Sequence, residues 1–517
     1  MPKWLNTAVF YEVYPQSFFD TNGDGIGDIN GITEKLDYIL SLGCNALWIN
    51  PCFDSPFHDA GYDVRDYKKV APRYGTNDDL IRCFQEAHRR GMHVLLDLVP
   101  GHTSEEHPWF LDSQKAEPGP YRDRYIWTGF AFQNAGGLPF IGGESQRNAS
   151  YILNFFKCQP ALNYGFLSPD QDWQFPVNHP SCIATREAMK DIMRFWLDQG
   201  CDGFRVDMAF SLVKNDDEVR SGTSAIWKDV RKMLDQEYPE AAIVAEWGNP
   251  ELSLPAGFHM DFYLNEINDT CGYRSLMRNY QGTFQNRVIN DQSYFKKDSP
   301  TDVSVFLQDY LPRYKNSRQF GFFCFLTCNH DTLRPRANLT PQELKLAYGF
   351  LFTMPGVPFL YYGDEIGMRY LDLPTKEGGY HRTGSRTPMQ WTGGKNLGFS
   401  TASPEALYLP VDPSPDAPTV ESEEKDENSL LHTVRSLLFL RSQYPDLQAS
   451  SSFEVISARP GEKLFAYRRG NLTILINPGS ASISLPVEAT ELLFLLGSCR
   501  LEGGCAVLDG QSFAVLK

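Results

Sequence analysis

The chain has 517 residues, of which 42% are hydrophobic, and a formal net charge of −16. It is too long for one ordinary core, so we expect a large barrel with additions or several domains. The acidic balance, with no cluster of Lys and Arg, argues against nucleic-acid binding, because that affinity comes mainly from neutralising phosphates.

Residues 1–7, the lengths of the apolar runs and the cysteines indicate the cellular compartment of the protein. Residues 1–7 lack the basic and then apolar pattern of a secretory signal, and no apolar run reaches the length of a membrane span. The eleven cysteines form no Cys-x-x-Cys pair, which favours free thiols in a reducing cytoplasm. Bridges Cys324/Cys328 and Cys499/Cys505 are the alternative. We therefore predict a cytoplasmic protein, a monomer or weak homo-oligomer, without a membrane or nucleic-acid partner.

Apolar, strand-like runs alternate with helical patterns along most of the chain. The helical patterns include residues 32–42, 80–90 and 184–199. The alternation predicts an α/β fold with a parallel sheet, and eight units predict a closed (β/α)8 TIM barrel, whose active site lies at the carboxyl ends of the strands. The strand candidates are residues 8–14, 46–49, 93–99, 203–206, 242–245, 260–264, 322–327 and 357–361.

Two regions depart from this alternation. Residues 102–178 are rich in Gly, Pro, Asn and aromatic residues without a sustained helical period, and a connection of that length is usually functional. We predict a domain inserted after strand 3. Short apolar runs after residue 450 predict a C-terminal antiparallel β-sandwich. The predicted domains are the barrel (1–101 and 179–444), the inserted domain (102–178) and the β-sandwich (445–517).

Acids follow three of the strand-like runs: Asp207, Glu246 and Asp331. One such acid is more often a cap or a salt-bridge partner than a catalyst. Together they supply what a retaining glycosidase needs, namely a nucleophile, a proton donor and an electron-rich pocket. The charge of Asp207 would keep a nearby Glu246 protonated, and Arg205, on the same strand face as Asp207, would keep the nucleophile ionised.

These acid segments resemble those of the α-amylase family of glycoside hydrolases, with most similarity to the oligo-1,6-glucosidase and α-glucosidase branch. The resemblance implies a barrel, a domain inserted after the third strand and a C-terminal β-sandwich. It implies that Asp207 is the nucleophile, Glu246 the general acid and base, and Asp331 the acid that grips sugar hydroxyls. The other segments that carry the resemblance are residues 10–15, 61–64, 97–99 with His102, 362–365 and 386–391.

The resemblance also implies a substrate pocket. His102 and His330 would bind hydroxyls of the terminal sugar, and Tyr62 would stack on it. Asp63 and Arg386 would pair with each other and close the far end, so that only chain ends enter.

We therefore expect a retaining, exo-acting α-glucosidase on disaccharides or short oligosaccharides. A transglycosylase or isomerase of the same family, such as a trehalose synthase or a sucrose isomerase, is the alternative, because the chemistry is shared up to the glycosyl ester. A catalytically inactive binding subunit is a third reading. It is disfavoured because such proteins lack one or more acids.

A loop near the amino terminus has the spacing of a cation site. Side chains of Asp20, Asn22, Asp24 and Asp28 and the carbonyl of Ile26 match the first half of an EF-hand loop. The twelfth position is a glycine, so the bidentate Glu is missing. A comparable loop of the branch holds a structural Ca²⁺ or Mg²⁺, and we predict one such ion. A metal-free turn is the alternative.

The chain departs from the family at three informative positions. Gly101 and Ala161 replace an Asn and an Asp that bind the Ca²⁺ between barrel and inserted domain in amylases, so we expect no ion there. Met208, which adjoins the nucleophile, is unusual at a position that tunes linkage preference. The linkage preference of the family branch is therefore not carried over to this chain.

Overall fold

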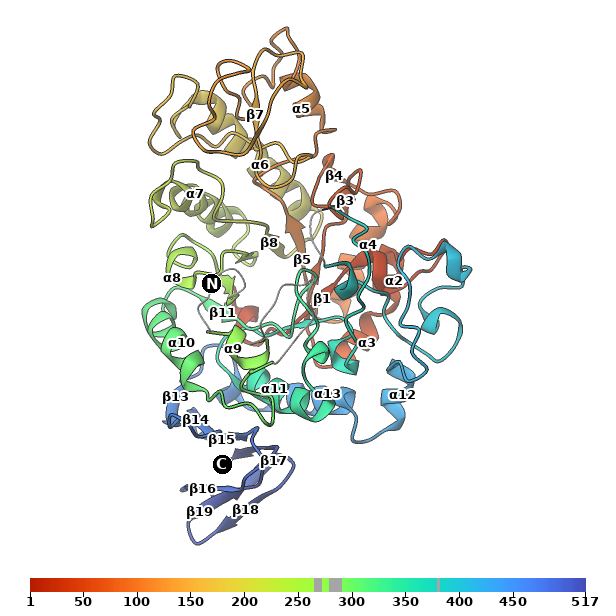
Figure 1. Cartoon of the computed structure of the whole chain (residues 1–517), viewed down its shortest axis with the longest axis vertical. Helices are drawn as coiled ribbons and strands as arrows, with labels where there is room; N and C mark the ends of the chain where they lie inside the picture. Colours follow the sequence, from red (N-terminus) through yellow and green to blue (C-terminus); the bar gives the residue numbers. More distant parts are fainter. Residues whose placement is uncertain (265–271, 279–290, 379–381) are drawn as a thin grey trace.

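The computed structural model describes residues 1–264, 272–278, 291–378 and 382–517, and eight parallel strands form its centre (Figure 1). Their order in the sheet is β11-β10-β9-β8-β5-β2-β1-β12. A bridge between Leu326 and Phe359 joins the two ends, so the predicted TIM barrel is confirmed. The strands are β1 (Phe10–Val13), β2 (Ala46–Ile49), β5 (His93–Leu98), β8 (Gly203–Val206), β9 (Ala242–Ala245), β10 (Met260–Phe262), β11 (Phe322–Cys324) and β12 (Phe359–Tyr361).

Large apolar side chains fill the barrel interior. Phe10 stacks on Phe359 at 4.4 Å between ring centroids, and Trp48 stacks on Phe262 at 5.2 Å. Strands buried on both faces are nearly continuous apolar runs, which is why the sequence revealed them. β8 begins at Gly203 with φ of +140°, where a Cβ would lie 1.8 Å from the carbonyl oxygen of Ala242. Only glycine allows β8 to start this close to β9.

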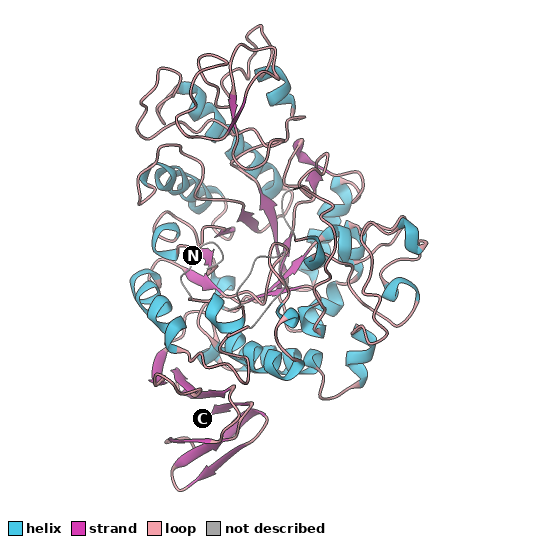
Figure 2. Cartoon of the chain, in the orientation of Figure 1, coloured by secondary structure: helices cyan, strands magenta, loops and turns pink. Residues whose placement is uncertain are grey.

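Helices surround the strands (Figure 2). Capping boxes at Thr76 with Asp79 and at Thr340 with Glu343 fix where two of them begin. The longer helices are α4 (Asn77–Arg89), α6 (Pro180–Asp198), α7 (Ser221–Glu237), α10 (Ser304–Ser317), α11 (Pro341–Thr353) and α13 (Leu430–Gln443). The shorter ones are α1 (Pro15–Phe18), α2 (Ile29–Glu34), α3 (Leu36–Ser41), α5 (Pro108–Ser113), α8 (Pro250–Ser253), α9 (Arg274–Met277) and α12 (Val420–Lys425).

The segment between β5 and α6 is mostly loop and lies at one end of the molecule (Figures 1 and 2). It contains α5 and the short pair β6 (Phe140–Ile141) and β7 (Tyr151–Ile152). It has an apolar cluster of its own, which includes Ile126, Phe166 and Trp173. A second short pair, β3 (Phe53–Asp54) and β4 (Asp66–Val70), follows β2.

Two antiparallel sheets form the C-terminal part, as predicted. Side chains of both sheets, such as Leu475 and Leu508, share one apolar cluster. The five-stranded sheet contains β13 (Glu454–Ser457), β14 (Phe465–Arg469), β15 (Leu472–Asn477), β20 (Ser512–Leu516) and β17 (Leu492–Leu496). The three-stranded sheet contains β16 (Ile483–Pro486), β19 (Cys505–Leu508) and β18 (Cys499–Glu502).

The described cysteines are free thiols, so neither candidate disulfide is formed. Among the described residues, no helix combines the length and the apolar character that a membrane span requires.

Candidate active site

Asp207 and Glu246 follow directly after the neighbouring strands β8 and β9, where Val206 pairs with Ala245. Arg205 of β8 connects the two acids. Its Nη1 lies 3.0 Å from Asp207 Oδ1, and its Nη2 lies 2.8 Å from Glu246 Oε1. One guanidinium therefore holds both carboxyl groups side by side.

Backbone contacts fix the two acids further. The N–H of Asp207 donates to Leu98 of β5, and that of Glu246 donates to Val206. The N–H of Met208 donates to Glu246 Oε2 at 2.9 Å. Met208 has φ of +40°, a left-handed conformation that costs a non-glycine residue about 1–2 kcal/mol. This turn brings the amide of Met208 to the Glu246 carboxyl group.

The electrostatics make Asp207 unlike an ordinary carboxylate. Burial raises the pKa of Asp207 well above its usual range and the nearby Glu246 raises it further, whereas Arg205 lowers it. Arg205 also binds Asp97 Oδ1 at 2.8 Å, so a single cation faces three carboxyl groups. Such a group of acids retains a proton more readily than isolated acids.

Asp331 lies in a second cluster of charges. Its Oδ1 is 2.7 Å from both Arg386 Nη2 and Arg382 Nη1, and its Oδ2 is 3.1 Å from His330 Nε2. Burial disfavours the anion, but His330, Arg382 and Arg386 outweigh it and hold the pKa of Asp331 well below its usual value. Asp331 is therefore an anion at neutral pH.

The acids are more exposed than the arginines that bind them. The side chains of Asp207, Glu246 and Asp331 are 10%, 23% and 17% exposed, against 1% for Arg205 and 0% for Arg386. A ligand can thus reach the carboxyl groups while the cations stay shielded from water.

The predicted pair of Asp63 and Arg386 is wrong. Asp63 accepts hydrogen bonds from Ser55 Oγ and from the backbone N–H groups of His58 and Asp59, so it shapes its own loop. Arg386 instead binds Asp331, together with Glu377 Oε2 at 2.9 Å.

Asp59 and Arg382 form the ion pair that the prediction assigned to Asp63 and Arg386. Arg382 also binds Asp331, and Gln159 donates to Asp59 Oδ2 at 2.6 Å. Burial raises the pKa of Asp59 to about 6 despite the charges of Arg382 and Arg386. This pair links the loop after β2 to Asp331.

Tyr62 and His330 lie beside acids of the site, and His102 contacts the backbone of Tyr62; their predicted contacts with the sugar remain a prediction. The Tyr62 ring stacks on His330 at 5.4 Å, and its hydroxyl lies 3.0 Å from Asp97 Oδ2 and 3.4 Å from Arg205 Nη1. His102 Nε2 donates to the carbonyl of Tyr62, and Asn154 donates to His102 Nδ1. Burial lowers the pKa of His102 to about 3, so its ring is neutral.

Sequence reasoning missed several residues of this site. Their shared feature is burial of a charged or amide group against a predicted site residue. Asp59 lies two residues before the Gly-Tyr-Asp segment, so this second acid in the same loop was a signal that the sequence offered. The missed residues are Glu12, Asn50, Asp59, Asp97, Glu377 and Arg382.

The predicted cation loop is a chain of turns. Asp20 accepts from the N–H groups of Asn22, Gly23 and Gly25, and the side chains of Asn22, Asp24 and Asp28 each accept from a backbone N–H nearby. Hard oxygen donors suit Ca²⁺ or Mg²⁺. In the part of the chain that the structure describes, however, no three His, Cys, Asp or Glu side chains converge closely enough to hold an ion. The single structural ion remains a prediction.

The space beside Gly101 contains an ammonium group. Lys214 Nζ donates to Asn154 Oδ1 at 2.9 Å and to the carbonyl of Ser211 at 2.7 Å. A Cβ on Gly101 would lie 2.6 Å from Asn154 Nδ2. Glycine at position 101 therefore allows Asn154 to bind both Lys214 and His102.

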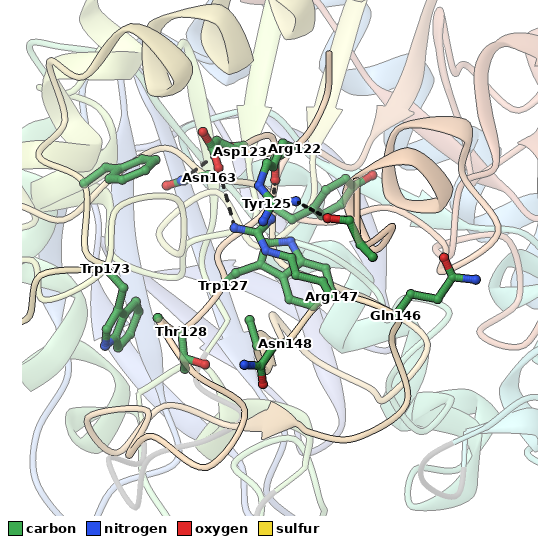
Figure 3. A pocket seen from close by; sticks show the side chains of 14 residues that line it. Arg122, Asp123, Tyr125, Trp127, Thr128, Gln146, Arg147, Asn148, Asn163 and Trp173 are labelled. Carbon is green, nitrogen blue, oxygen red and sulfur yellow. Dashed lines mark hydrogen bonds and ion pairs between the residues drawn. The ribbon is translucent and has the colours of Figure 1, made fainter. Parts of the chain in front are cut away.

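A cavity of about 380 Å³ lies within the inserted segment and contains none of the predicted site residues (Figure 3). Its wall includes Trp127 and Trp173. Arg147 lies over the Trp127 ring and donates to the carbonyl of Arg122 at 2.6 Å. We place the chemistry at the barrel acids, because acids with perturbed pKa converge there and not in this cavity.

Comparisons with known proteins find relatives over most of the chain. Trehalose synthase/amylase TreS of Mycolicibacterium smegmatis is 35% identical over 518 residues, which cover 90% of this chain and 80% of that protein. Oligo-1,6-glucosidase of Heyndrickxia coagulans is 30% identical over 565 residues and 96% of both chains.

Solved structures show the same architecture. A mutant of isomaltulose synthase from Erwinia rhapontici, in complex with its natural substrate sucrose, is 26% identical and has a TM-score of 0.80 over 100% of this chain and 99% of that one. The family model "Alpha amylase, catalytic domain" matches residues 12–450. The chain therefore belongs to the α-amylase family of glycoside hydrolases and transglycosylases.

Proposed function

We propose that this enzyme removes terminal α-glucosyl units from disaccharides or short oligosaccharides with retention of configuration. The observation that carries the proposal is the Arg205 guanidinium, which binds both Asp207 and Glu246. Asp207 attacks the anomeric carbon while Glu246 protonates the glycosidic oxygen, so the bond to the leaving sugar breaks. Water then attacks the Asp207 ester as Glu246 takes its proton, which releases glucose and restores both acids.

One proton shared by the pair would serve this division of roles. Burial and the proximity of the two acids disfavour a second negative charge, although Arg205 opposes this effect, so we propose that one proton remains on the pair in the free enzyme. When Asp207 becomes an ester its charge disappears. Glu246 then ionises more easily and serves as the base.

The ion pairs around Asp331 support an exo mode of action. Asp59, Arg382, Asp331 and Arg386 form a continuous set of contacts next to the acids. Such a wall would bind the hydroxyls of a terminal sugar and leave no path for a chain that continues beyond it.

Arg382→Ala is expected to lower kcat/KM on maltose by about 10²-fold, because truncating one partner of a buried charge pair typically costs 2–5 kcal/mol. Asp59 would be left without its cation, and Asp331 would lose one of its two arginine partners. Arg435→Ala, which removes the partly exposed ion pair with Glu424, is the control and should leave kcat/KM unchanged. Equal kcat/KM for Arg382→Ala and the wild type would contradict the proposed wall.

An isomerase is the second candidate, because a trehalose synthase/amylase and an isomaltulose synthase are among the similar proteins. The two functions differ in whether water or a sugar hydroxyl attacks the ester. Maltose, isomaltose, sucrose and trehalose, each offered alone, distinguish them by product analysis. Hydrolysis predicts that free glucose exceeds any rearranged disaccharide. The reverse ratio would replace the hydrolase proposal with the isomerase.

We also propose that the loop of residues 20–28 holds one structural Ca²⁺ or Mg²⁺. Adding the ion after chelation should raise Tm by roughly 2–3 °C at a concentration 100 times Kd. Asp24→Asn keeps the acceptor for the Ile26 N–H but removes a charge, so it should reduce that response. An unchanged Tm with either ion would favour the metal-free turn.

A further inference from the structure

His330 lies between two acids from different parts of the barrel. The ring is fully buried, with Nδ1 2.8 Å from Glu12 Oε1 of β1 and Nε2 3.1 Å from Asp331 Oδ2. Nε2 also lies 2.6 Å from the hydroxyl of Tyr62. Glu12 is fully buried as well, and the proposed reaction does not use it.

The hydrogen bonds show which ring nitrogens carry protons. The Tyr62 hydroxyl donates to Asp97 Oδ2, so it accepts from His330 Nε2. Asp331 is an anion and accepts only. Nε2 therefore carries a hydrogen. Nδ1 faces the carboxyl group of Glu12, which accepts a second hydrogen bond from Asn50 Nδ2 at 3.2 Å. Asn50 Nδ2 also lies 3.1 Å from Nδ1, but Glu12 Oε1 is an acceptor for this amide, so Nδ1 can donate to the closer Glu12 Oε1 at 2.8 Å.

We propose that Glu12 is a positioning residue that keeps the His330 ring doubly protonated and directs its Nε2–H at Asp331 and Tyr62. The proposal rests on the proposed function only for its effect on catalysis. The doubly protonated ring itself follows from contacts within the protein.

The surrounding charges agree with a cationic ring. Burial disfavours it, but the carboxylates of Asp331 and Glu12 outweigh burial and raise the pKa of His330 to about 9. Burial raises the pKa of Glu12, and its bond to His330 opposes that rise. The other titratable or charged groups that face the ring or its backbone are Tyr14, Tyr62, Asp97 and Arg386, and Arg205 acts on Glu12.

A charged ring does two things that a neutral one does not. It adds the attraction between two opposite charges to the hydrogen bond with Asp331, which a neutral donor does not supply. It also offers a fixed N–H beside the acid assigned to the sugar hydroxyls. Glutamine at position 12 would keep the size of the side chain and remove its charge.

Histidine-labelled enzyme tests the proposal without any substrate. The imidazole ¹⁵N and ¹³C signals of His330, identified by their loss in His330→Asn, report its protonation by NMR. In the wild type the ring should be doubly protonated at pH 7 and titrate near pH 9. A wild-type ring that is neutral at pH 7 would overturn the proposal, whatever any Glu12 variant does.

Glu12→Gln should lower the His330 midpoint by about 1–3 pH units, the usual effect of one nearby opposite charge. Glu365→Gln is the matched control. It also places an amide in a fully buried site, where Tyr11 and Tyr38 bind the carboxyl group, and it should leave the His330 midpoint in place. An unchanged midpoint in folded Glu12→Gln would refute the role of Glu12.

The activity of Glu12→Gln separates positioning from simple loss of structure. KM should rise more than kcat falls, and the increase should grow with pH as His330 loses its proton. A KM ratio between variant and wild type that stays constant with pH would contradict the assigned role. If the wild type had no glucosidase activity, the NMR result would still decide the state of His330, while the proposed function would fail separately.

Discussion

Asp207→Asn is expected to lower kcat on every accepted substrate by on the order of 10⁴-fold or more. An amide does not form the glycosyl ester, so the first chemical step has no nucleophile. The side-chain oxygen still accepts from Arg205, and the substitution adds no volume. We therefore expect the fold to remain, with a melting temperature close to that of the wild type.

Initial rates on maltose and sucrose, with calorimetric binding of the same sugars, check this expectation. Asp202→Asn is the matched control, because Asp202 precedes β8 while Asp207 follows it, and it binds His88 and His93 away from the acids. The control should keep nearly full kcat. If Asp207→Asn kept a tenth of the wild-type kcat, another residue would have to be the nucleophile.

The barrel could be predicted because each of its strands is buried on both sides. A run such as residues 242–245 is apolar at every position, and the structure places it in β9 between β8 and β10. The acids could be predicted for the same reason. Asp207 and Glu246 are the first polar residues after apolar strands, and neighbouring parallel strands end at the same edge of the sheet.

The wall of the pocket could not be predicted in the same way. Two acids, Asp59 and Asp63, lie in one loop, and sequence alone does not show which of them faces the site. The carboxyl group of Asp63 accepts hydrogen bonds from backbone N–H groups of its own loop, as is common for Asp in turns. That leaves Asp59 to pair with Arg382, 323 residues away in another irregular segment.

Contacts across the barrel were beyond sequence reasoning too. Glu12 lies in β1 and His330 beyond β11, and β12 lies between these strands in the sheet order. Their contact depends on how far each side chain reaches toward the carboxyl end of the barrel. The segments that contain Glu12 and His330 both resemble family motifs, but that resemblance assigned no role to Glu12.

Glu246→Gln is expected to separate the two chemical steps. On an unactivated disaccharide kcat/KM should fall by about 10²–10⁴-fold, the usual contribution of a positioned general acid. The amide does not protonate the leaving oxygen, although its oxygen still accepts from the N–H of Met208. Aryl α-glucosides with acidic phenols need no such proton, so their first step should be much less affected.

On those aryl glucosides the second step should then become limiting, because no base activates water. We expect a burst of phenol equal to the enzyme concentration, and intact-mass spectra that show one glucosyl unit on the protein. Azide, which attacks without a base, should restore turnover and yield glucosyl azide. Glu251→Gln is the control, because Glu251 lies in α8, shortly after β9, and accepts a hydrogen bond from Asn316. It should show neither the burst nor the azide response. Equal losses on aryl and disaccharide substrates, with no adduct, would show that Glu246 does not transfer the proton. The role of Glu246 would then be limited to the negative charge that it places beside Arg205.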